Sequence, residues 1–330
     1  MTIDIVIPHY REAWEVGRTC FEMIALQRLI HFEDIHVYLV QDGDEGALPA
    51  ECFEGYPYRI TQIRIPHSGV SAARNAGMDA GNGDWVMFCD FDDSFFTTHT
   101  LFHFFEAIRN PEANIVICGY ESEERDPDGT PWAKVHDGDD YVLLHGKMFR
   151  RSWMEAQRLR FDPELTIHED SYFMTLARYL ARGNEIVFIR EGPLYATYWN
   201  EHSVTRDGDN AKHNNLLLRR YDEFFRKSEH LVDELLRRGM TRHAEIIASQ
   251  TLCDTYENLA RISWRGRDTS GLTAGAAAFA KKYRELLGRI TDKEYFEGLE
   301  VARSAISKNN DLGLETVSFP AWMDQIRSQS

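Results

Sequence analysis

Short apolar segments of strand length alternate with segments of helical periodicity along the first part of this chain. Residues 3–7 are mostly β-branched and end at Pro8, and a second apolar run covers residues 36–40. Between them, apolar residues recur at three- and four-residue spacing from Val16 to Gln27. A strand, a helix and a strand in this order form a βαβ unit, whose strands are parallel and whose crossover is right-handed. The opening of the chain therefore predicts an α/β fold.

The same two periodicities continue through the rest of the chain. Further strands are predicted at 58–65, 85–89, 115–120, 146–151, 185–189 and 193–199, and helices at 70–79, 98–109, 153–159 and 171–181. A turn signal at 126–130 separates two short strands. After residue 207 the pattern is helical throughout, with helices predicted at 212–238, 241–264, 273–288 and 292–307. An α/β region followed by an all-helical region is expected.

The charge of the chain changes near the same position. The formal net charge is −16, and residues 1–206 hold 18 Lys and Arg against 34 Asp and Glu, whereas residues 207–330 hold 19 against 19. We therefore predict a boundary between residues 206 and 207. An acidic first region argues against passive binding to a nucleic-acid backbone.

The sequence predicts a globular protein of the cytoplasm. No apolar run reaches about 18 residues, the length expected of a membrane-spanning helix. Asp4 interrupts the first apolar run and Pro8 ends it, which does not fit a signal peptide. Five cysteines lie at scattered positions without close pairs, so they are expected to be reduced thiols of the core.

Three carboxylates, Asp90, Asp92 and Asp93, follow the predicted strand 85–89 within four positions. Carboxylates this close repel one another unless a cation lies among them, and ligands bind at the carboxyl edge of open α/β sheets. One interpretation is a divalent-metal site. The other is turn chemistry, with Asp93 and Ser94 capping a helix that begins near residue 97 or 98. The carboxylates alone leave both open.

Five motifs in order resemble the family 2 glycosyltransferases of the GT-A fold over about residues 1–206. They are Ile-Val-Ile-Pro-His-Tyr-Arg (5–11), Val-Gln-Asp-Gly-Asp (40–44), Gly-Val-Ser-Ala-Ala-Arg-Asn-Ala-Gly-Met (69–78), Asp-Phe-Asp-Asp (90–93) and His-Glu-Asp-Ser-Tyr-Phe (168–173). The resemblance implies a Rossmann-like mixed sheet flanked by helices, with a nucleotide-binding half at about 1–95 and an acceptor half at about 96–206. It implies a hexosyl- or N-acetylhexosaminyltransferase that moves a sugar from a nucleotide-sugar, most often a UDP-sugar, to an acceptor hydroxyl with inversion.

The resemblance also assigns a metal site. Asp93 would bind a divalent cation, Mn²⁺ or Mg²⁺, and Asp92 would reach the cation or the ribose. Asp90 would support them. A segment at 198–206 corresponds to one that supplies charge in the family, where His202 would complete the metal site and Arg206 would pair with the diphosphate. The family commonly has an Arg where this chain has Trp199, which weakens this part of the correspondence.

A nucleobase pocket and a catalytic base are implied as well. Asp42 would accept the uracil N–H, Arg74 would lie near the base, and Pro8 and Tyr10 would form the floor. The alternatives are that Asp42 serves the Asp-Gly turn and that Arg74 is a solvated helix residue.

Asp170 corresponds to the base that removes the acceptor's proton, with Glu169 beside it orienting the site or meeting the acceptor. Both carboxylates could instead charge the first turn of the following helix, and the two roles are compatible. Lys147 and His145 are further candidates near the acceptor.

Two rival functions and several partners remain open at this stage. A nucleotidyltransferase would share the nucleotide-binding sheet and acidic site, but a basic Gly-rich loop would be expected where residues 8–11 read Pro-His-Tyr-Arg. A non-catalytic nucleotide- or sugar-binding protein is the second rival. The acceptor could be a glycan, a lipid-linked sugar, a protein or another hydroxyl compound. The helical region 207–330 is expected to pack on the catalytic domain or on a second copy in a homo-oligomer.

Overall fold

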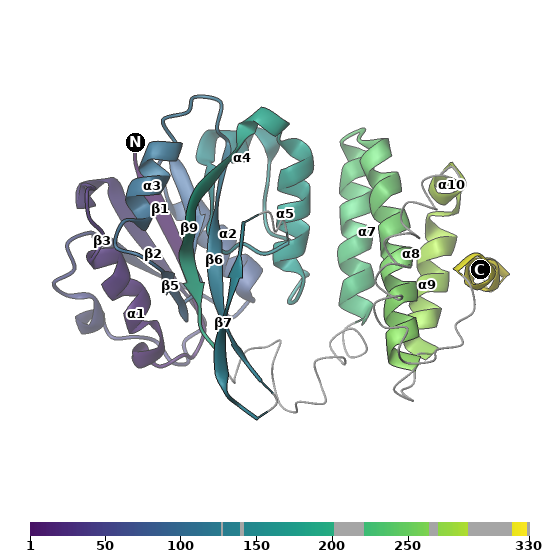
Figure 1. The fold of residues 1–330 in the computed structure, drawn as a ribbon, viewed down its shortest axis with the longest axis horizontal. Helices are drawn as coiled ribbons and strands as arrows, with labels where there is room; N and C mark the ends of the chain where they lie inside the picture. The colour runs from purple at the N-terminus through teal and green to yellow at the C-terminus, as the bar shows by residue number, and fades with distance from the viewer. Residues whose placement is uncertain (127, 139–141, 201–220, 264–269, 290–318, 329–330) are drawn as a thin grey trace. The chain divides into compact units, whose positions relative to one another are not determined.

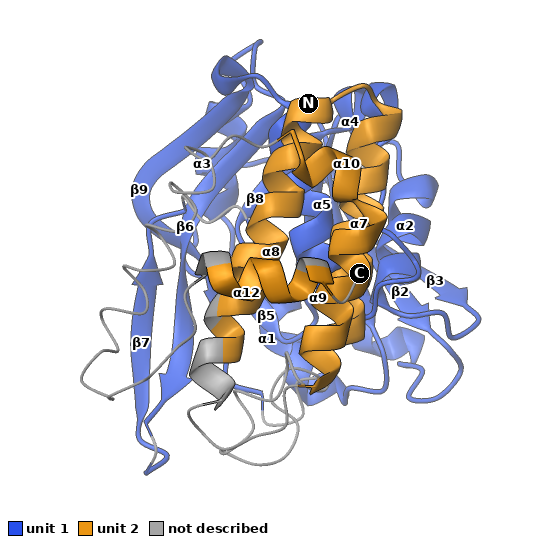
Figure 2. Cartoon of the chain, turned by 90° about the vertical axis from the view of Figure 1, so that its right-hand side faces the viewer, with its two compact units in different colours: residues 1–201 blue, residues 202–330 orange. Residues whose placement is uncertain are grey.

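The computed structural model describes residues 1–126, 128–138, 142–200, 221–263, 270–289 and 319–328. It divides into two compact units, Met1–Glu201 and His202–Ser330 (Figure 1). Figure 2 colours these units blue and orange, and each is described below by itself.

The described residues of unit 1 form nine strands and five α-helices. The strands are β1 (Ile3–His9), β2 (Ile35–Asp42), β3 (Arg59–Ile65), β4 (Trp85–Phe88), β5 (Asp93–Phe95), β6 (Ile115–Arg125), β7 (Pro131–His136), β8 (Lys147–Arg150) and β9 (Ile186–Thr197). The helices are α1 (Trp14–Ala25), α2 (Val70–Ala80), α3 (Thr100–Ala107), α4 (Arg151–Gln157) and α5 (Glu169–Leu180). Short 3₁₀ turns lie at Phe32–Asp34, Ala50–Phe53 and Gly183–Glu185.

The strands form one mixed sheet in the order β3-β2-β1-β4-β8-β6-β9-β5, and β7 pairs with the second half of β6. The first four strands in this order run parallel, as expected of βαβ units, and β8 is antiparallel to both of its neighbours. β9 runs parallel to β6 and antiparallel to β5. The Rossmann-like mixed sheet flanked by helices is confirmed.

Alternate side chains of β1 point to opposite faces of the sheet, and an apolar layer covers each face. Ile5 and Ile7 belong to a buried cluster with α1 and α3, which contribute Phe21 and Phe104. On the other face, a Cβ at Gly77 of α2 would meet the side chains of Val6 and Val40, so this helix packs directly against the strands. The same face holds an aromatic cluster from β4, β8, α5 and the loop before it, made of Phe88, Phe149, Phe161 and Phe173.

Three local predictions for unit 1 were wrong. Asp93 and Ser94 do not cap a helix: they begin β5, and α3 starts at Thr100 without a side-chain cap. The two strands predicted at 185–189 and 193–199 are one strand, β9, whose register with β6 shifts around Gly119. Val16, expected on the buried face of α1, is 43% exposed.

Unit 2 is helical as predicted. Its described helices are α7 (Tyr221–Arg237), α8 (Thr241–Ser263), α9 (Ser270–Lys282), α10 (Arg284–Leu287) and α12 (Phe319–Ser328). The helix predicted at 273–288 is divided at Tyr283, and α12 was not predicted. Residues 212–220 and the helix predicted at 292–307 lie outside the described residues. None of the helices in the described ranges is long and apolar enough to cross a membrane.

Candidate functional site

Acidic residues that are distant in the sequence lie along the carboxyl edge of the parallel strands. Asp42 is the last residue of β2, Asp90 follows β4, and Glu169 and Asp170 form the first turn of α5. Arg74 of α2 lies among three of these four. This edge is where open α/β sheets bind their ligands.

The guanidinium of Arg74 connects three of these carboxylates. Its Nη1 donates to Glu169 Oε1 at 2.9 Å and to Asp170 Oδ1 at 2.8 Å, and its Nη2 donates to Asp90 Oδ1 at 2.7 Å. The Arg74 side chain is only 3% exposed, so the alternative of a solvated helix residue is wrong. In this structure its contacts are with the carboxylates, which places the end of β4 and the start of α5 in one site.

Asp170 has the electrostatics of a group that exchanges a proton near neutral pH. Burial, with repulsion from Glu169 and Asp90, raises the pKa of Asp170 to about 7, although Arg74 opposes the shift. The residue before α5, His168, has a left-handed backbone with φ of 68° and carries no side-chain cap. Both acidic residues therefore also charge the first turn of α5, as the alternative interpretation held.

A second group joins Asp90 and Asp93 to His145. One ligand atom from each of these residues lies within 4.8 Å of the others. His145 Nε2 is 3.6 Å from Asp93 Oδ2, which also accepts a hydrogen bond of 2.8 Å from the hydroxyl of Tyr195. Burial and repulsion from Asp90 and Asp92 raise the pKa of Asp93 well above its usual value. Burial lowers the pKa of His145, which favours the neutral imidazole.

This group fits a divalent cation. The two carboxylates are suitable donors for Mn²⁺ or Mg²⁺, and the neutral imidazole favours a transition metal such as Mn²⁺ over Mg²⁺. Donors about 2.1 Å from one cation lie roughly 3 to 4 Å apart. Because the three donor atoms already lie within 4.8 Å of one another, they would move by no more than about 1 Å to meet at one cation. A cation would also relieve the repulsion that raises the pKa of Asp93.

The three candidate metal ligands, Asp90, Asp93 and His145, differ from the metal ligands that the motifs implied. Asp90 was expected only as a support, and His145 was expected near the acceptor. Asp92 is not among the three, and its Oδ2 instead accepts a hydrogen bond of 2.8 Å from Asn200 Nδ2. His202 and Arg206 lie outside the described residues.

The predicted nucleobase residues lie at the ends of β1 and β2. Asp42 is 4% exposed and accepts hydrogen bonds from the backbone N–H groups of Ser68 and Gly69 and a contact of 2.9 Å from His67 Nδ1. Gly69 supports this loop with a φ of 89°, a conformation that favours glycine. A carboxylate has about four acceptor positions, so one remains for a further donor.

Pro8 is the penultimate residue of β1, and Tyr10 directly follows the last residue of that strand. The ring of Tyr10 stacks on His67 with centroids 4.4 Å apart, and the guanidinium of Arg11 lies 4.7 Å from the ring centroid. Pro8 pairs with Val40 across the two strands. A flat aromatic surface therefore stands beside Asp42.

Lys147 does not face an acceptor. Its side chain is fully buried in β8, and its Nζ donates to the carbonyl of His145 at 3.3 Å. Because it has no exposed surface, Lys147 does not itself contact an acceptor in this structure. The supporting role predicted for it stays a prediction, and its contact with the backbone of His145 is compatible with that role.

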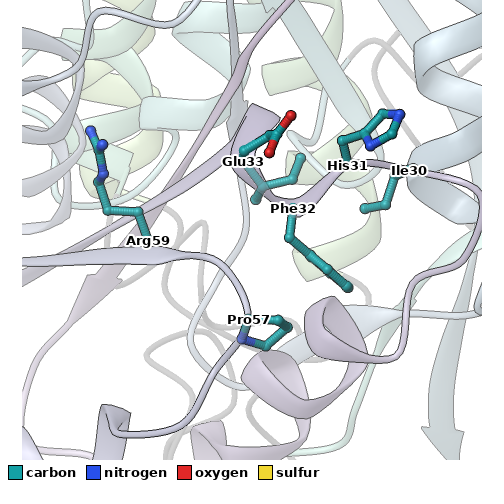
Figure 3. Close-up of a pocket in the computed structure, with 7 residues that line it drawn as sticks. Ile30, His31, Phe32, Glu33, Pro57 and Arg59 are labelled. Atoms are coloured by element: carbon teal, nitrogen blue, oxygen red, sulfur yellow. The ribbon is translucent and has the colours of Figure 1, made fainter.

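One cavity lies away from this edge. It has a volume of about 470 Å³ and is lined by residues at the amino ends of β2 and β3, including Ile35 and Arg59. Figure 3 shows Glu33, Phe32 and Pro57 around it. Ligands of parallel sheets bind at the opposite end of the strands, so size alone does not make this cavity the site.

The family can now be stated from comparison with known proteins. The model of the family described as Glycosyl transferase family 2 matches residues 4–182, more than half of the chain. The chain belongs to glycosyl transferase family 2. This match runs from β1 to the end of α5, ends before β9, and includes the two acidic motifs that Arg74 connects.

Curated relatives of this family 2 chain cover part of its length. It is 30% identical over 200 residues to the putative glycosyltransferase EpsH of Bacillus subtilis, covering 54% of this chain and 55% of the relative. It is 30% identical over 149 residues to the succinoglycan biosynthesis protein ExoW of Rhizobium meliloti, covering 44% and 41%. The chain thus spans about half the length of these relatives.

Solved structures confirm the GT-A fold. S. aureus TarS 1–349 in complex with UDP superposes with a TM-score of 0.63 at 15% identity, covering 94% of this chain and 89% of that one. The mannosyltransferase PcManGT from Pyrobaculum calidifontis, in complex with GDP-Man and Mn²⁺, gives a TM-score of 0.50 at 15% identity and coverages of 99% and 84%. At this identity the likeness establishes the fold.

Three site residues had no role in the sequence interpretation. Tyr195 binds Asp93, His67 contacts Asp42, and Asn200 binds Asp92. Tyr195 and Asn200 follow their partners by more than 100 positions, so no local pattern could have joined them. His67 lies in the loop before α2, where only its closeness to the Gly69 motif was a signal.

Proposed function

We propose that this chain is a metal-dependent inverting glycosyltransferase that takes a sugar from a nucleotide-sugar, with Asp170 as the base. The main support is that Arg74 holds Asp90 on one side and Glu169 and Asp170 on the other. The acidic end of β4 and the predicted base thereby share one site. A hexosyl- or N-acetylhexosaminyltransferase with a UDP-sugar donor is our specific expectation.

In this proposal Asp90, Asp93 and His145 hold the divalent cation. When bound, the cation would neutralise charge on the departing diphosphate. Tyr195 fixes one Asp93 oxygen through its hydroxyl. Asp42 and Tyr10 bind the nucleobase, the first through its remaining acceptor position and the second through its ring.

Asp170 accepts the proton of the acceptor hydroxyl. Arg74 engages Oδ1 of Asp170, and this fixes the direction of the other oxygen, Oδ2. A pKa of about 7 suits a base that works near neutral pH. One carboxylate on the face opposite the leaving group is sufficient for a single inverting displacement.

The donor is tested with a panel of nucleotide-sugars. UDP-sugars come first because TarS was solved with UDP, and GDP-mannose belongs in the panel because PcManGT was solved with it. Thermal unfolding with and without Mn²⁺ identifies the donor, because a ligand of the native state raises the apparent stability. Release of UDP or GDP supports the transferase, release of pyrophosphate indicates a nucleotidyltransferase, and no release by a chain that binds the donor indicates a non-catalytic binder.

A further inference from the structure

His67 contacts both residues to which the proposed function assigns the nucleobase. Its Nδ1 lies 2.9 Å from Asp42 Oδ2, and its ring stacks on that of Tyr10 with centroids 4.4 Å apart and planes inclined by 14°. Proteins hold a nucleobase by the same two interactions, stacking on an aromatic ring and hydrogen bonds along the edge of the base. In this structure the imidazole therefore makes the contacts that are required of the base.

The hydrogen in the contact between His67 and Asp42 belongs to the imidazole. Oδ1 of Asp42 accepts the N–H of Ser68 at 2.6 Å, and Oδ2 accepts the N–H of Gly69 at 2.9 Å. A carboxylate that accepts hydrogen bonds at both oxygens supplies no hydrogen of its own, so His67 Nδ1 is the donor. A flat ring that points an N–H at Asp42 resembles uracil, whose N3–H lies between two carbonyl groups.

The imidazole and a nucleobase cannot occupy this place together. The side chain of Asp42 is 4% exposed, whereas that of His67, which touches it, is 59% exposed. Gly43 borders the same place, since a Cβ there would lie 3.4 Å from the Cβ of His67 and 3.9 Å from the ring of Tyr10. A base that takes both Asp42 Oδ2 and this face of Tyr10 has to displace the imidazole.

The His67 side chain is free to move without disturbing the loop that carries it. This loop joins β3 to α2, and the backbone N–H groups of Ser68 and Gly69 attach it to Asp42. Among the described residues, the His67 side chain has its hydrogen bond with Asp42 and its ring contact with Tyr10. Exposed side chains change rotamer within picoseconds to nanoseconds. His67 can therefore leave while Asp42 stays in place.

We propose that His67 and the nucleobase of the donor compete for one place, formed by Asp42 Oδ2 and the ring of Tyr10, and that the base displaces the imidazole. This inference rests on the proposed function, since it concerns the same donor site. Once His67 has left, Asp42 has a free acceptor position on each oxygen.

The chemistry of this place selects a class of nucleobase. Uracil, thymine and guanine carry an N–H on the ring at their hydrogen-bonding edge, as the imidazole does. The corresponding ring nitrogens of adenine and cytosine are acceptors, which cannot bond to a carboxylate that is itself an acceptor. The inferred ligands are therefore uridine, thymidine or guanosine diphosphates.

Titration calorimetry of the full chain with UDP, dTDP, GDP, ADP and CDP in the presence of Mn²⁺ tests the proposal. At least one nucleotide with a ring N–H should bind, and ADP and CDP should bind at least about tenfold more weakly. His67→Ala should bind the preferred nucleotide about three- to tenfold more tightly than the wild type. The reason is that the apparent affinity of the wild type is reduced by the fraction of molecules in which the imidazole holds the place.

The matched control is His31→Ala. His31 is an exposed histidine beside the cavity at the amino ends of β2 and β3. Its variant should bind the nucleotide within about twofold of the wild type. Misfolding of His67→Ala would weaken nucleotide binding, so the expected gain in affinity cannot come from misfolding. Weaker or unchanged binding in His67→Ala, or a preference for ADP or CDP, overturns the proposal.

NMR of the wild type labelled with ¹³C-histidine observes the displacement without relying on a variant for the effect. The His67 ring signal is assigned by its absence from the spectrum of His67→Ala. Stacking on Tyr10 shifts this signal through the ring current, and the preferred nucleotide should move it to the position of an exposed histidine. An unmoved His67 signal at saturating nucleotide overturns the proposal, because the base would then bind beside the imidazole.

The failure of this inference is separable from that of the proposed function. If the wild type cleaves a sugar donor but His67→Ala does not bind the nucleotide more tightly, the inference about His67 fails and the transferase stands. If His67→Ala binds more tightly and the His67 signal moves, but no donor is cleaved, the inference stands and the proposed function fails. If neither chain binds any of the nucleotides, both fail.

Discussion

Arg74 is the residue on which the candidate site depends most. One buried guanidinium satisfies carboxylates from the end of β4 and the start of α5. Removing a buried charge partner leaves the remaining charges uncompensated. Conversely, the paired carboxylates strongly favour the charged form and raise the pKa of Arg74 well above its usual value. The residue therefore connects stability with the position of Asp170.

Arg74→Ala is predicted to lower the free energy of unfolding by about 3–5 kcal/mol. Arg74→Lys restores a charge but not the planar fork, and should recover only part of this loss. Denaturant unfolding followed by circular dichroism measures both. The control is Arg160→Ala, whose exposed ion pair with Asp79 is worth less than about 1 kcal/mol. Equal losses at the two positions would contradict this account of Arg74.

The pH dependence of turnover should show the titration of Asp170. A base must be ionised to accept a proton, and burial raises the pKa of this group to about 7. We therefore expect kcat/KM to fall as the pH decreases through about 7, measured with Mn²⁺ and the donor identified by the panel. An acidic limb near pH 4, the range of an unperturbed carboxylate, would contradict the assignment.

Asp170→Asn should lower kcat by about 10²- to 10⁴-fold, because an amide cannot accept the proton. Donor binding, read from the thermal shift, should change little, since the predicted nucleotide contacts come from other elements. Asp162→Asn is expected to keep its activity and serves as the control for a carboxylate change in the segment before α5, because an amide oxygen can still accept the hydrogen bond that the half-buried Asp162 Oδ1 accepts from the Glu164 N–H. A kcat of Asp170→Asn near that of the wild type would remove Asp170 from the mechanism.

At the scale of elements, α1 packs against the loop that carries the carboxylates. A Cβ at Gly17 would lie 2.2 Å from the ring of Phe91, which stands between Asp90 and Asp92. Gly17→Ala should therefore displace this ring and destabilise the chain by about 1–3 kcal/mol, as overpacking does. Gly183→Ala is the control, because nothing lies within 4 Å of its Cβ position. The midpoints of thermal unfolding of the two variants are compared. Equal midpoints would show that α1 does not constrain the loop that carries Phe91.

Elements with strong local periodicity were predictable, and those made by long-range pairing were not. Residues 3–7 and 70–79 carry complete strand and helix patterns, and both elements formed. β5 has three residues and exists because Asp93 pairs with Thr197 more than 100 positions later. The local sequence pattern at Asp93 and Ser94 indicated only a possible helix cap. The candidate site shows the same difference. The motifs predicted Asp90, Asp170 and Arg74 as site residues, but only the folded structure shows that Arg74 contacts both carboxylates.

At the scale of the whole molecule, the two units have separate apolar cores. Unit 1 is built around the sheet, and unit 2 around helix residues such as Leu231, Leu235 and Phe279. We propose that unit 1 folds by itself. The sequence indicated an all-helical second region from its periodicity, but helices of this kind carry no signal for a role.

A chain of residues 1–200 is predicted to unfold cooperatively, measured by circular dichroism on heating. A chain of residues 1–180 lacks β9, which pairs with both β5 and β6, and should not fold. If residues 1–180 do not fold, the circular dichroism transition of residues 1–200 depends on β9 and therefore reports the complete sheet. A non-cooperative transition of residues 1–200 would mean that unit 1 requires unit 2.

The central claim is that the carboxylates at the end of β4 and the start of α5 perform one inverting displacement on a nucleotide-sugar. Proton NMR tests it most directly, by following the anomeric signal of the sugar released from the UDP-α-sugar or GDP-α-sugar that the panel identifies. We predict that the β-anomer forms first, that its formation requires Mn²⁺, and that Asp170→Asn abolishes it. First formation of the α-anomer, or release that is unaffected by Asp170→Asn, would contradict the account.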